Sequence, residues 1–422
     1  MFTDRTFCSL PFSSIQINPG GDFKVCCFSG SHGNHGMAEE DDGTMMNIMT
    51  HDIEEAFNSV LHREIRLAQS KDERHPCCEV CWIRDDAAGA SHRTVRSNRM
   101  REFDGTVKLE DAGAAMNPDG TIDRPVLVDL DIRFGNLCNA KCLHCGPIYS
   151  NLWYEDYVRF ERKTKFNVGA KTYNIRSENG VLKSDLTDNK WWETDRWWSQ
   201  FDRIKGRLRK IYVTGGEPFL VPAHDEMLDR LIAAGLACSI EMWYDTNLSA
   251  INPRILTKLG HFKRVYISVS LDDVEERYEL FRNPLKVGKL VENLKLLGKY
   301  NLTANEISSC IGIPTATSIL RLVPFFGEIG YDMYRLRLLR HPAEFDLKHL
   351  PRAEKIKLID RHQNSNVGHR NSVMIMGYLR NNLDVEDPGM VQRFIKRMDA
   401  HDSMRRTDWR SVMPDVAEMV GA

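Results

Sequence analysis

The chain has 422 residues, 42% hydrophobic and 27% charged, which is enough apolar material for one large core or two or three smaller ones. Lys and Arg (57) nearly balance Asp and Glu (59), and the formal net charge of -2 excludes a generally basic surface, so nucleic acid is possible as a partner but not implied. Because no apolar run approaches the roughly 18 residues of a membrane span and the start lacks a signal-peptide pattern, we expect a cytoplasmic protein with no membrane partner.

Cysteine placement is the most informative feature of the composition. The 11 cysteines are about 2.6% of the chain, far below the roughly 8–10% of a disulfide scaffold. In a reducing compartment, tight groups of cysteines indicate metal binding more than disulfides. Nine of them form three groups: Cys8 with Cys26 and Cys27; Cys77 and Cys78 with Cys81; and Cys138 and Cys142 with Cys145. We expect the other two, Cys238 and Cys310, to be core thiols in apolar strands.

The first hundred residues predict a small unit of short elements. Gly20 and Gly21 precede the run 23–26, a pattern typical of a β-hairpin. A stripe of apolar residues at helical spacing predicts one helix over 53–68. The segment 104–123 has the turn-rich composition of a linker. We therefore divide off residues 1–103 as an N-terminal domain.

Two segments of this N-terminal domain suggest ligand binding but have simpler interpretations. His32 and His35 lie in a Gly- and Ser-rich loop, and the stretch 93–101 is basic. Either could bind a phosphate or a substrate. A solvated loop and a charged helix face are the simpler interpretations.

From about residue 124 onward, β-rich runs alternate with amphipathic helices, of which 287–300 is the clearest. Six strands alternating with helices predict a parallel sheet with crossover helices. Six is two short of a closed eight-stranded barrel, so we expect an α/β fold with a partial (βα)6 TIM-like barrel over 124–345. Residues 346–422 predict a helical C-terminal extension. The predicted strands are 126–133, 210–213, 239–244, 264–270, 306–313 and 334–339.

A long insertion, about 150–209, separates the first two predicted strands and contains five tryptophans. Trp198, Phe201 and Ile204 fit one face of a helix. The simpler interpretation is a helix that packs in the core, and the alternative is an aromatic wall for a substrate.

Three cysteines directly follow the first predicted strand, at the end where α/β barrels assemble their active sites. Cys138, Cys142 and Cys145 are too close in sequence for useful disulfides and suit a loop around one face of an iron–sulfur cluster. Three ligands leave one iron of a cubane open for an exogenous ligand. A structural zinc site is the main alternative, but such sites usually have four protein ligands.

This CxxxCxxC spacing resembles the signature of the radical SAM superfamily. The resemblance implies a [4Fe-4S] cluster whose open iron chelates S-adenosylmethionine (SAM), with one-electron cleavage of SAM to a 5′-deoxyadenosyl radical. His144 stands where that family usually has an aromatic residue.

The second predicted strand ends in Gly215, Gly216 and Glu217, followed by Pro218. Glycines allow a close backbone approach to a ligand, and Glu217 can pair with an ammonium group. Alone, a strand-ending Gly-Gly is often just a turn. Beside the cysteine triplet, the run resembles the family's motif that holds the amino group of SAM.

Four later residues resemble weaker parts of the family pattern. Asn247 lies in a Thr-Asn turn after the third strand, and Ser270 and Asp272 resemble a ribose-facing segment at the fourth. Arg282 matches an arginine that often follows that segment. Each alone is also explained by a capped turn or a surface pair.

The N-terminal cysteines can present four thiolates from a hairpin and a CxxC step. Their pattern resembles the auxiliary-cluster domain called SPASM, or its shortened twitch form, here placed before the barrel. The run from Trp82 to Arg93 also resembles phage- and bacteria-associated twitch-containing radical SAM proteins. The resemblance implies an auxiliary [4Fe-4S] cluster, with a zinc knuckle as the alternative occupant. The expected ligands are Cys8, Cys26, Cys78 and Cys81, with Cys27 and Cys77 as the neighbours that could replace them.

Together these resemblances imply an oxidoreductase that abstracts hydrogen from an unactivated carbon of a small metabolite, a nucleotide or modified base, or a peptide. They also imply an electron donor such as flavodoxin or ferredoxin, and they assign no catalytic residue. The alternative is a non-catalytic iron–sulfur electron carrier or binding module that no longer cleaves SAM. The Gly215–Glu217 run argues against that alternative, because a carrier needs no site for the SAM amine.

Overall fold

The computed structural model of the chain describes residues 2–30, 36–86, 91–168, 171–328, 330, 334–365 and 370–422. His32 and His35 lie outside the described residues. No helix in the described part of the chain is both long and apolar enough to cross a membrane. The chain forms two compact units, which we call unit 1 (Met1–Leu137, Thr164–Tyr244 and Asn252–Tyr266) and unit 2 (Cys138–Lys163, Asp245–Ile251 and Ile267–Ala422).

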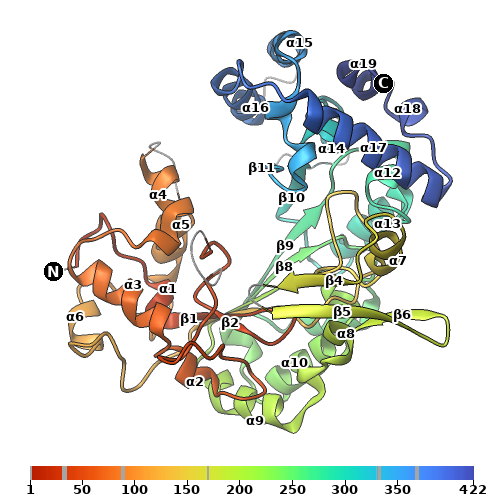
Figure 1. Cartoon of the computed structure of the whole chain (residues 1–422). Coiled ribbons are helices and arrows are strands. Elements are labelled where there is room, and N and C mark those ends of the chain that lie inside the picture. Colours follow the sequence, from red (N-terminus) through yellow and green to blue (C-terminus); the bar gives the residue numbers. More distant parts are fainter. Residues whose placement is uncertain are drawn as a thin grey trace. The chain divides into compact units, whose positions relative to one another are not determined.

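Unit 1 is built on strands in the order β9-β8-β7-β3-β1-β2, to which β9 contributes only Arg264–Tyr266. Strands β1, β2 and β8 are labelled in Figure 1. Strands β1, β3, β7 and β8 run parallel, and β2 is antiparallel to β1, which confirms the predicted hairpin. Ile15 of β1 pairs with Leu130 of β3, so the N-terminal hairpin continues the sheet of the later strands. The bounds are β1 (Ser14–Ile17), β2 (Phe23–Lys24), β3 (Asp129–Ile132), β7 (Lys210–Val213), β8 (Glu241–Thr246) and β9 (Arg264–Ser270).

The arginines of the basic stretch 93–101 are paired within unit 1. Helix α5 (His92–Met100) directs Arg96 to the buried Asp129 of β3, and Nη2 of Arg99 lies 2.7 Å from Oε2 of Glu241 in β8. These ion pairs tie the N-terminal segment to the central strands. Each of these ion pairs joins a residue before position 103 to a residue after position 124. The predicted domain boundaries at 103, 124 and 345 stay a prediction.

Short helices surround this sheet and its loops. The helix expected over 53–68 is in fact two, because the buried guanidinium of Arg66 donates to the carbonyl of Phe57 (2.6 Å) where the first one ends. The bounds are α1 (Leu10–Ser13), α2 (Ile53–Ala56), α3 (Val60–Ser70), η1 (Pro76–Cys78), α4 (Glu79–Asp86), α6 (Ala112–Ala115), η4 (Pro218–Leu220), α10 (Pro222–Ala233), η5 (Ala237–Ser239) and α11 (Pro253–Leu259).

The insertion contains a feature that the sequence did not predict, a three-stranded antiparallel sheet in the order β4-β5-β6. The predicted core helix is present as α9, which buries Trp198, Phe201 and Ile204. The bounds are β4 (Lys165–Val168), β5 (Lys171–Glu178), β6 (Val181–Ser184), α8 (Asp185–Asp188), η2 (Trp191–Glu193), α9 (Asp195–Ile204) and η3 (Lys205–Arg207).

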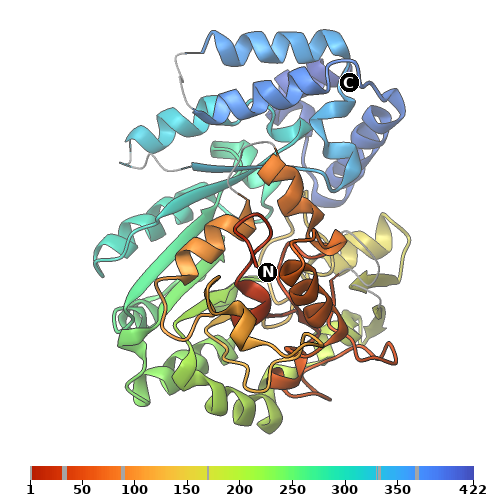
Figure 2. The same cartoon turned by 90° about the vertical axis from the view of Figure 1, so that its left-hand side faces the viewer.

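Unit 2 contains the end of β9, from Ile267 on, and two further parallel strands, β10 and β11, of which β10 pairs with it. Its core includes Ile311 beside β11 and Phe394 and Trp409 of the C-terminal segment, whose blue helices lie together in Figures 1 and 2. The bounds are α7 (Trp153–Arg159), α12 (Glu275–Phe281), α13 (Val287–Gly298), β10 (Glu306–Ile311), η6 (Ile313–Thr315), α14 (Ile319–Glu328), β11 (Tyr334–Leu338), η7 (Ala343–Phe345), η8 (Leu347–His349), α15 (Arg352–Gln363), α16 (Arg370–Asn381), α17 (Pro388–Arg405), α18 (Trp409–Val412) and α19 (Pro414–Val420).

The fold class is therefore confirmed as α/β, with a largely parallel sheet and crossover helices. All six predicted strands are present, as β3, β7, β8, β9, β10 and β11, and the C-terminal extension is helical. The expectation for Cys238 is wrong. Cys238 is exposed in η5 rather than buried in a strand, because the chain enters β8 only at Glu241. Cys310 does lie in a strand, β10, and is partly buried.

Candidate functional site

The cysteine triplet lies at the start of unit 2, on a loop without regular structure whose backbone is held from two directions. The N–H groups of Lys141 and Leu143 donate to the carbonyls of Asn283 (2.7 Å) and Phe281 (2.8 Å). The indole Nε1 of Trp153 donates to the carbonyl of Cys142 (3.1 Å). These bonds fix the loop conformation around the middle cysteine.

Burial controls the ionisation of the triplet. It raises the pKa of Cys142, and it raises that of Cys145 to about 12, with the charge of Cys142 as the next cause. Without a bound metal, both sulfurs are therefore protonated thiols near neutral pH. A bound metal displaces these protons, because thiolates are the form that ligates metals.

Two predicted site residues lie against this triplet. Nη1 of Arg282 is 3.7 Å from Sγ of Cys142, and its Nε is 2.7 Å from Oδ2 of Asp272. Burial, the largest single influence, acts to lower the pKa of Arg282, but Asp272, Cys142 and other nearby acidic groups together outweigh it, and the pKa is raised. Asp272 lies two residues beyond Ser270, the last residue of β9. Its Oδ1 also accepts a hydrogen bond from the N–H of Cys310 (2.7 Å). A permanent positive charge thus stands beside the buried sulfur.

Asn247 contacts the triplet loop through its amide. Its Nδ2 donates to Oδ1 of Asn139 (3.1 Å), the residue that follows Cys138. Asn139 in turn donates to Oγ of Ser249 (2.8 Å), whose N–H is bound by Asn247 (2.9 Å). The predicted Thr-Asn turn therefore acts on the loop by hydrogen bonds.

His144 packs as a neutral aromatic plane. Its ring stacks on Phe281 with centroids 5.0 Å apart and an interplanar angle of 24°. Burial lowers the pKa of His144 to about 4, so the ring is uncharged near neutral pH. In charge and stacking it resembles the aromatic side chain that the family usually has there.

The Gly215–Glu217 run lies in unit 1 and packs against the segment that leads into the triplet. Gly215 has a φ of +124°, and a Cβ on Gly216 would lie 2.1 Å from the carbonyl oxygen of Leu137. The N–H of Glu217 donates to that same oxygen (2.8 Å). Both glycines are therefore needed for the backbone path. The Glu217 side chain is 1% exposed and accepts the N–H of Phe219 (3.4 Å).

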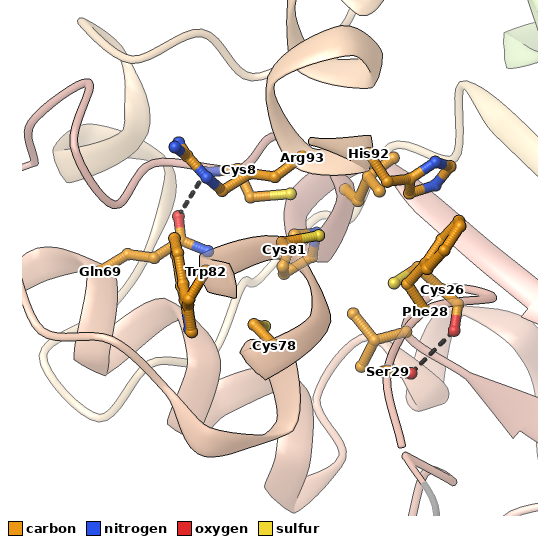
Figure 3. Close-up of a pocket in the computed structure, with 13 residues that line it drawn as sticks. Cys8, Cys26, Phe28, Ser29, Gln69, Cys78, Cys81, Trp82, His92 and Arg93 are labelled. Atoms are coloured by element: carbon orange, nitrogen blue, oxygen red, sulfur yellow. Dashed lines mark hydrogen bonds between the residues drawn. The ribbon is translucent and has the colours of Figure 1, made fainter. Parts of the chain in front are cut away.

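Four N-terminal cysteines line one cavity of unit 1. Figure 3 shows Cys8, Cys26, Cys78 and Cys81 around this cavity, which has an empty volume of about 450 Å³ including open solvent at its mouth. They come from the loop before α1, the end of the β1–β2 hairpin, η1 and α4. The structure thus brings together the four predicted auxiliary ligands.

The two neighbouring cysteines differ from these four. Neither Cys27 nor Cys77 is among the described residues that line the cavity. Sγ of Cys27 instead lies 3.7 Å from Nε2 of His92. As the chain leaves β2, Cys26 therefore lines the cavity and Cys27 does not.

The charges of neighbouring cysteines raise one another's pKa values in this cavity. Burial, followed by the nearby Cys26, raises the pKa of Cys8 to about 12, and the pKa of Cys78 is raised by burial and then by Cys26 and Cys8. In the described part of the chain no three His, Cys, Asp or Glu side chains already converge as on a single metal ion. Four thiols around one space form a donor set that suits an iron–sulfur cluster or zinc.

Comparison with known proteins adds two domain matches. Residues 132–317 match the Radical SAM superfamily, and residues 8–82 match SPASM, an iron-sulfur cluster-binding domain. None of the curated proteins matches the chain.

Several solved structures resemble the chain. Native anSMEcpe with bound AdoMet is 17% identical over 54% of this chain and 57% of its own, less than two thirds of its length, with a TM-score of 0.36. Streptococcus suis SuiB bound to S-adenosylmethionine is 14% identical over 76% of this chain and 66% of its own, with a TM-score of 0.38. TsrM from Kitasatospora setae, a radical S-adenosylmethionine methyltransferase, is 12% identical over 50% of this chain and 36% of its own, with a TM-score of 0.33.

Proposed function

Because the chain carries a radical SAM domain and a SPASM domain, we propose that it reductively cleaves SAM and abstracts a hydrogen atom from an unactivated carbon of its substrate. The radical SAM domain implies a [4Fe-4S] cluster and SAM, and the SPASM domain implies an auxiliary cluster. When bound, the first cluster supplies the electron that breaks the sulfonium bond of SAM. The protein's own contribution is binding, orientation and exclusion of water.

The observation that supports this proposal most directly is the concentration of predicted residues on the triplet loop. Cys138, Cys142 and Cys145 would hold the first cluster. Arg282 places a buried cation beside Cys142, and this charge favours a thiolate ligand over a thiol.

Glu217 would bind the ammonium group of SAM. The carboxylate of Glu217 is 1% exposed, and it can form a charge-assisted hydrogen bond with the cationic ammonium group of SAM. The absence of a side chain at Gly216 lets the backbone pass close to Leu137, where the N–H of Glu217 donates to the carbonyl of Leu137. Asn247, Ser270, Asp272 and Arg282 of unit 2 are the other residues proposed to bind SAM.

Cys8, Cys26, Cys78 and Cys81 would hold the auxiliary cluster, with zinc as the less favoured occupant. The substrate is a small metabolite, a nucleotide or modified base, or a peptide, and flavodoxin or ferredoxin would deliver the electron. Because tight groups of cysteines that bind metal are typical of a reducing compartment, the cytoplasm is the proposed location.

The decisive experiment incubates anaerobically reconstituted protein with SAM, a strong reductant and deuterated candidate substrates. Deuterium recovered in 5′-deoxyadenosine identifies the abstracted hydrogen. Cys142→Ala serves as the matched control and should give none. If the protein holds its iron but forms no 5′-deoxyadenosine, with or without substrate, the proposal is wrong and the chain is an electron carrier or binding module.

A further inference from the structure

Helix α17 of the C-terminal segment directs three titratable side chains toward helix α7. Arg397, His401 and Arg405 are spaced by four residues, so they lie on one face of α17. The guanidinium groups of Arg397 and Arg405 lie over the ring of Trp153, at 5.6 and 5.5 Å from its centroid. The ring of His401 meets the same indole edge-on at 5.4 Å. Helix α17 thus covers Trp153, whose indole donates a hydrogen bond to the carbonyl of Cys142.

One buried carboxylate joins this helix to the cysteine loop. Asp156 of α7 is 1% exposed, and its Oδ2 accepts bonds from Nε (3.1 Å) and Nη2 (2.7 Å) of Arg405. Its Oδ1 accepts a bond from Nζ of Lys141 (2.9 Å). Lys141 stands between Cys138 and Cys142. Each oxygen of the carboxylate therefore serves a different segment, one the C-terminal helix and the other the loop.

The remaining neighbour does not compete for this carboxylate. Nδ1 of His401 lies 3.8 Å from Oδ2 of Asp156, but burial, followed by the charge of Arg405, lowers the pKa of His401 to about 2. The imidazole is therefore neutral. The carboxylate has two cationic partners, Lys141 and Arg405, and the side chain of Arg405 is itself only 1% exposed.

Removing the negative charge would leave two cations facing one another in a buried site, and breaking a buried ion pair in this way is strongly destabilising. The effect would reach the cysteines, since Lys141 is part of their loop. Hydrogen-bonded groups behind metal ligands fix the orientation of those ligands, and losing such a group typically weakens metal binding by about 10- to 100-fold.

We propose that Asp156 and Arg405 are positioning residues that hold the Cys138–Cys145 loop in its ligating conformation, which makes helix α17 a functional part of the cofactor site. The inference rests on the proposed function in one respect, that Cys138, Cys142 and Cys145 hold a cluster. The C-terminal segment, which has no chemical signature in the sequence, thereby acquires a role.

The first test compares Asp156→Asn and Arg405→Lys with a control variant on helix α17. Asp399→Asn is the matched control, because Asp399 forms an exposed ion pair with Arg410 and its side chain is 45% exposed. Each anaerobically reconstituted protein is challenged with an iron chelator. About four irons should be lost from Asp156→Asn at least about ten times faster than from the wild type or the control. The EPR signal that responds to SAM should also change shape in Asp156→Asn.

The second test does not need a cluster. Hydrogen exchange of the backbone amides of residues 138–145 is measured in cofactor-free protein, where Asp156→Asn should accelerate exchange and Asp399→Asn should not. If the wild type binds no cluster, the proposed function fails, yet this exchange still decides whether the carboxylate holds the loop. Arg405→Lys keeps the charge but loses the paired donors, so it should lie between wild type and Asp156→Asn, and it carries the test if Asp156→Asn does not fold. Wild-type exchange and iron retention in the folded variants overturn the inference.

Discussion

Arg282 directs Nη1 of its guanidinium at the sulfur of Cys142, 3.7 Å away. The same side chain is anchored by Asp272, and both members of that pair are buried. A cation in this position acts on any negative charge that the sulfur carries, and the effect is strong because burial keeps the local dielectric low.

We expect Arg282→Met to lower the midpoint potential of the cluster bound by the triplet. The reduced cluster carries one more negative charge than the oxidised cluster, so a nearby cation favours reduction, and removing it disfavours reduction. An EPR-monitored redox titration measures the shift. The double variant Asp272→Asn/Arg282→Met should recover most of the folding stability, because it leaves no unpaired buried carboxylate, but not the potential. An unchanged potential in both variants would show that the contact has no electrostatic role.

Cys142→Ala should abolish reductive SAM cleavage and remove about one cluster's worth of iron, while the N-terminal site keeps its own. The two sets of cysteines lie on separate loops, so they should load independently. Iron and sulfide analysis together with 5′-deoxyadenosine assays measure both effects. Cys238→Ala, at an exposed cysteine in η5, is the control and should behave like the wild type. Normal 5′-deoxyadenosine formation by Cys142→Ala would remove the triplet from the mechanism.

The double variant Cys78→Ala/Cys81→Ala should lose the iron and the sulfide of one cluster and should keep its affinity for SAM. Product formation should fall even where SAM cleavage survives. The matched control is Cys27→Ala/Cys77→Ala, because neither residue is among those that line the cavity.

Elemental analysis decides what the N-terminal cavity holds. Stoichiometric zinc with only about four irons in the wild-type protein would replace the auxiliary cluster by a zinc knuckle. The match of residues 132–317 to the Radical SAM superfamily would be unaffected by that result. A larger loss of iron in the Cys27→Ala/Cys77→Ala control than in the test variant would instead reassign the ligands.

Glu217→Gln should weaken SAM binding by about 10- to 100-fold with the cluster intact, because a charge-assisted hydrogen bond contributes roughly 1.5–3 kcal/mol. Equilibrium binding of SAM to the reconstituted protein measures this change. Glu226→Gln, on the surface of α10, is the control. Equal affinities for the two variants would exclude Glu217 from the SAM site.

The free energy of unfolding should fall as the pH falls below 6.5, in part through His224. This side chain is fully buried, its Nε2 lies 2.9 Å from the hydroxyl of Tyr244, and burial lowers its pKa to about 4. Between pH 6.5 and 4 the unfolded chain binds a proton that the folded protein excludes, so this group removes about 1.4 kcal/mol per pH unit, and the loss is complete below about pH 4.

Urea unfolding of the cofactor-free protein at several pH values measures this dependence. His224→Gln should flatten the slope between pH 6.5 and 4, whereas His261→Gln, at an exposed histidine, should leave it unchanged. A steeper or unchanged slope in His224→Gln would contradict the assignment.

Much of the site could be predicted because its signals are local. Cys138, Cys142 and Cys145 are close in sequence, and their spacing alone indicates three ligands for one cluster. The alternation of strands with helices likewise predicts a parallel sheet, since parallel strands require crossover connections. The hairpin and the CxxC step supplied the four N-terminal cysteines in the same way.

Other features depend on contacts between residues far apart in the chain, and only the tertiary structure decided them. Strand β1 joins β3 in one sheet, so the N-terminal segment shares unit 1 with the strands after it. Asp156 is bound by Arg405, 249 residues further along. Such pairs leave no periodic trace, because each partner is one charged residue among many and its significance comes from burial. The sequence by itself determined which side chains are proposed to supply the chemistry, and the packing of distant segments decided which charges surround them.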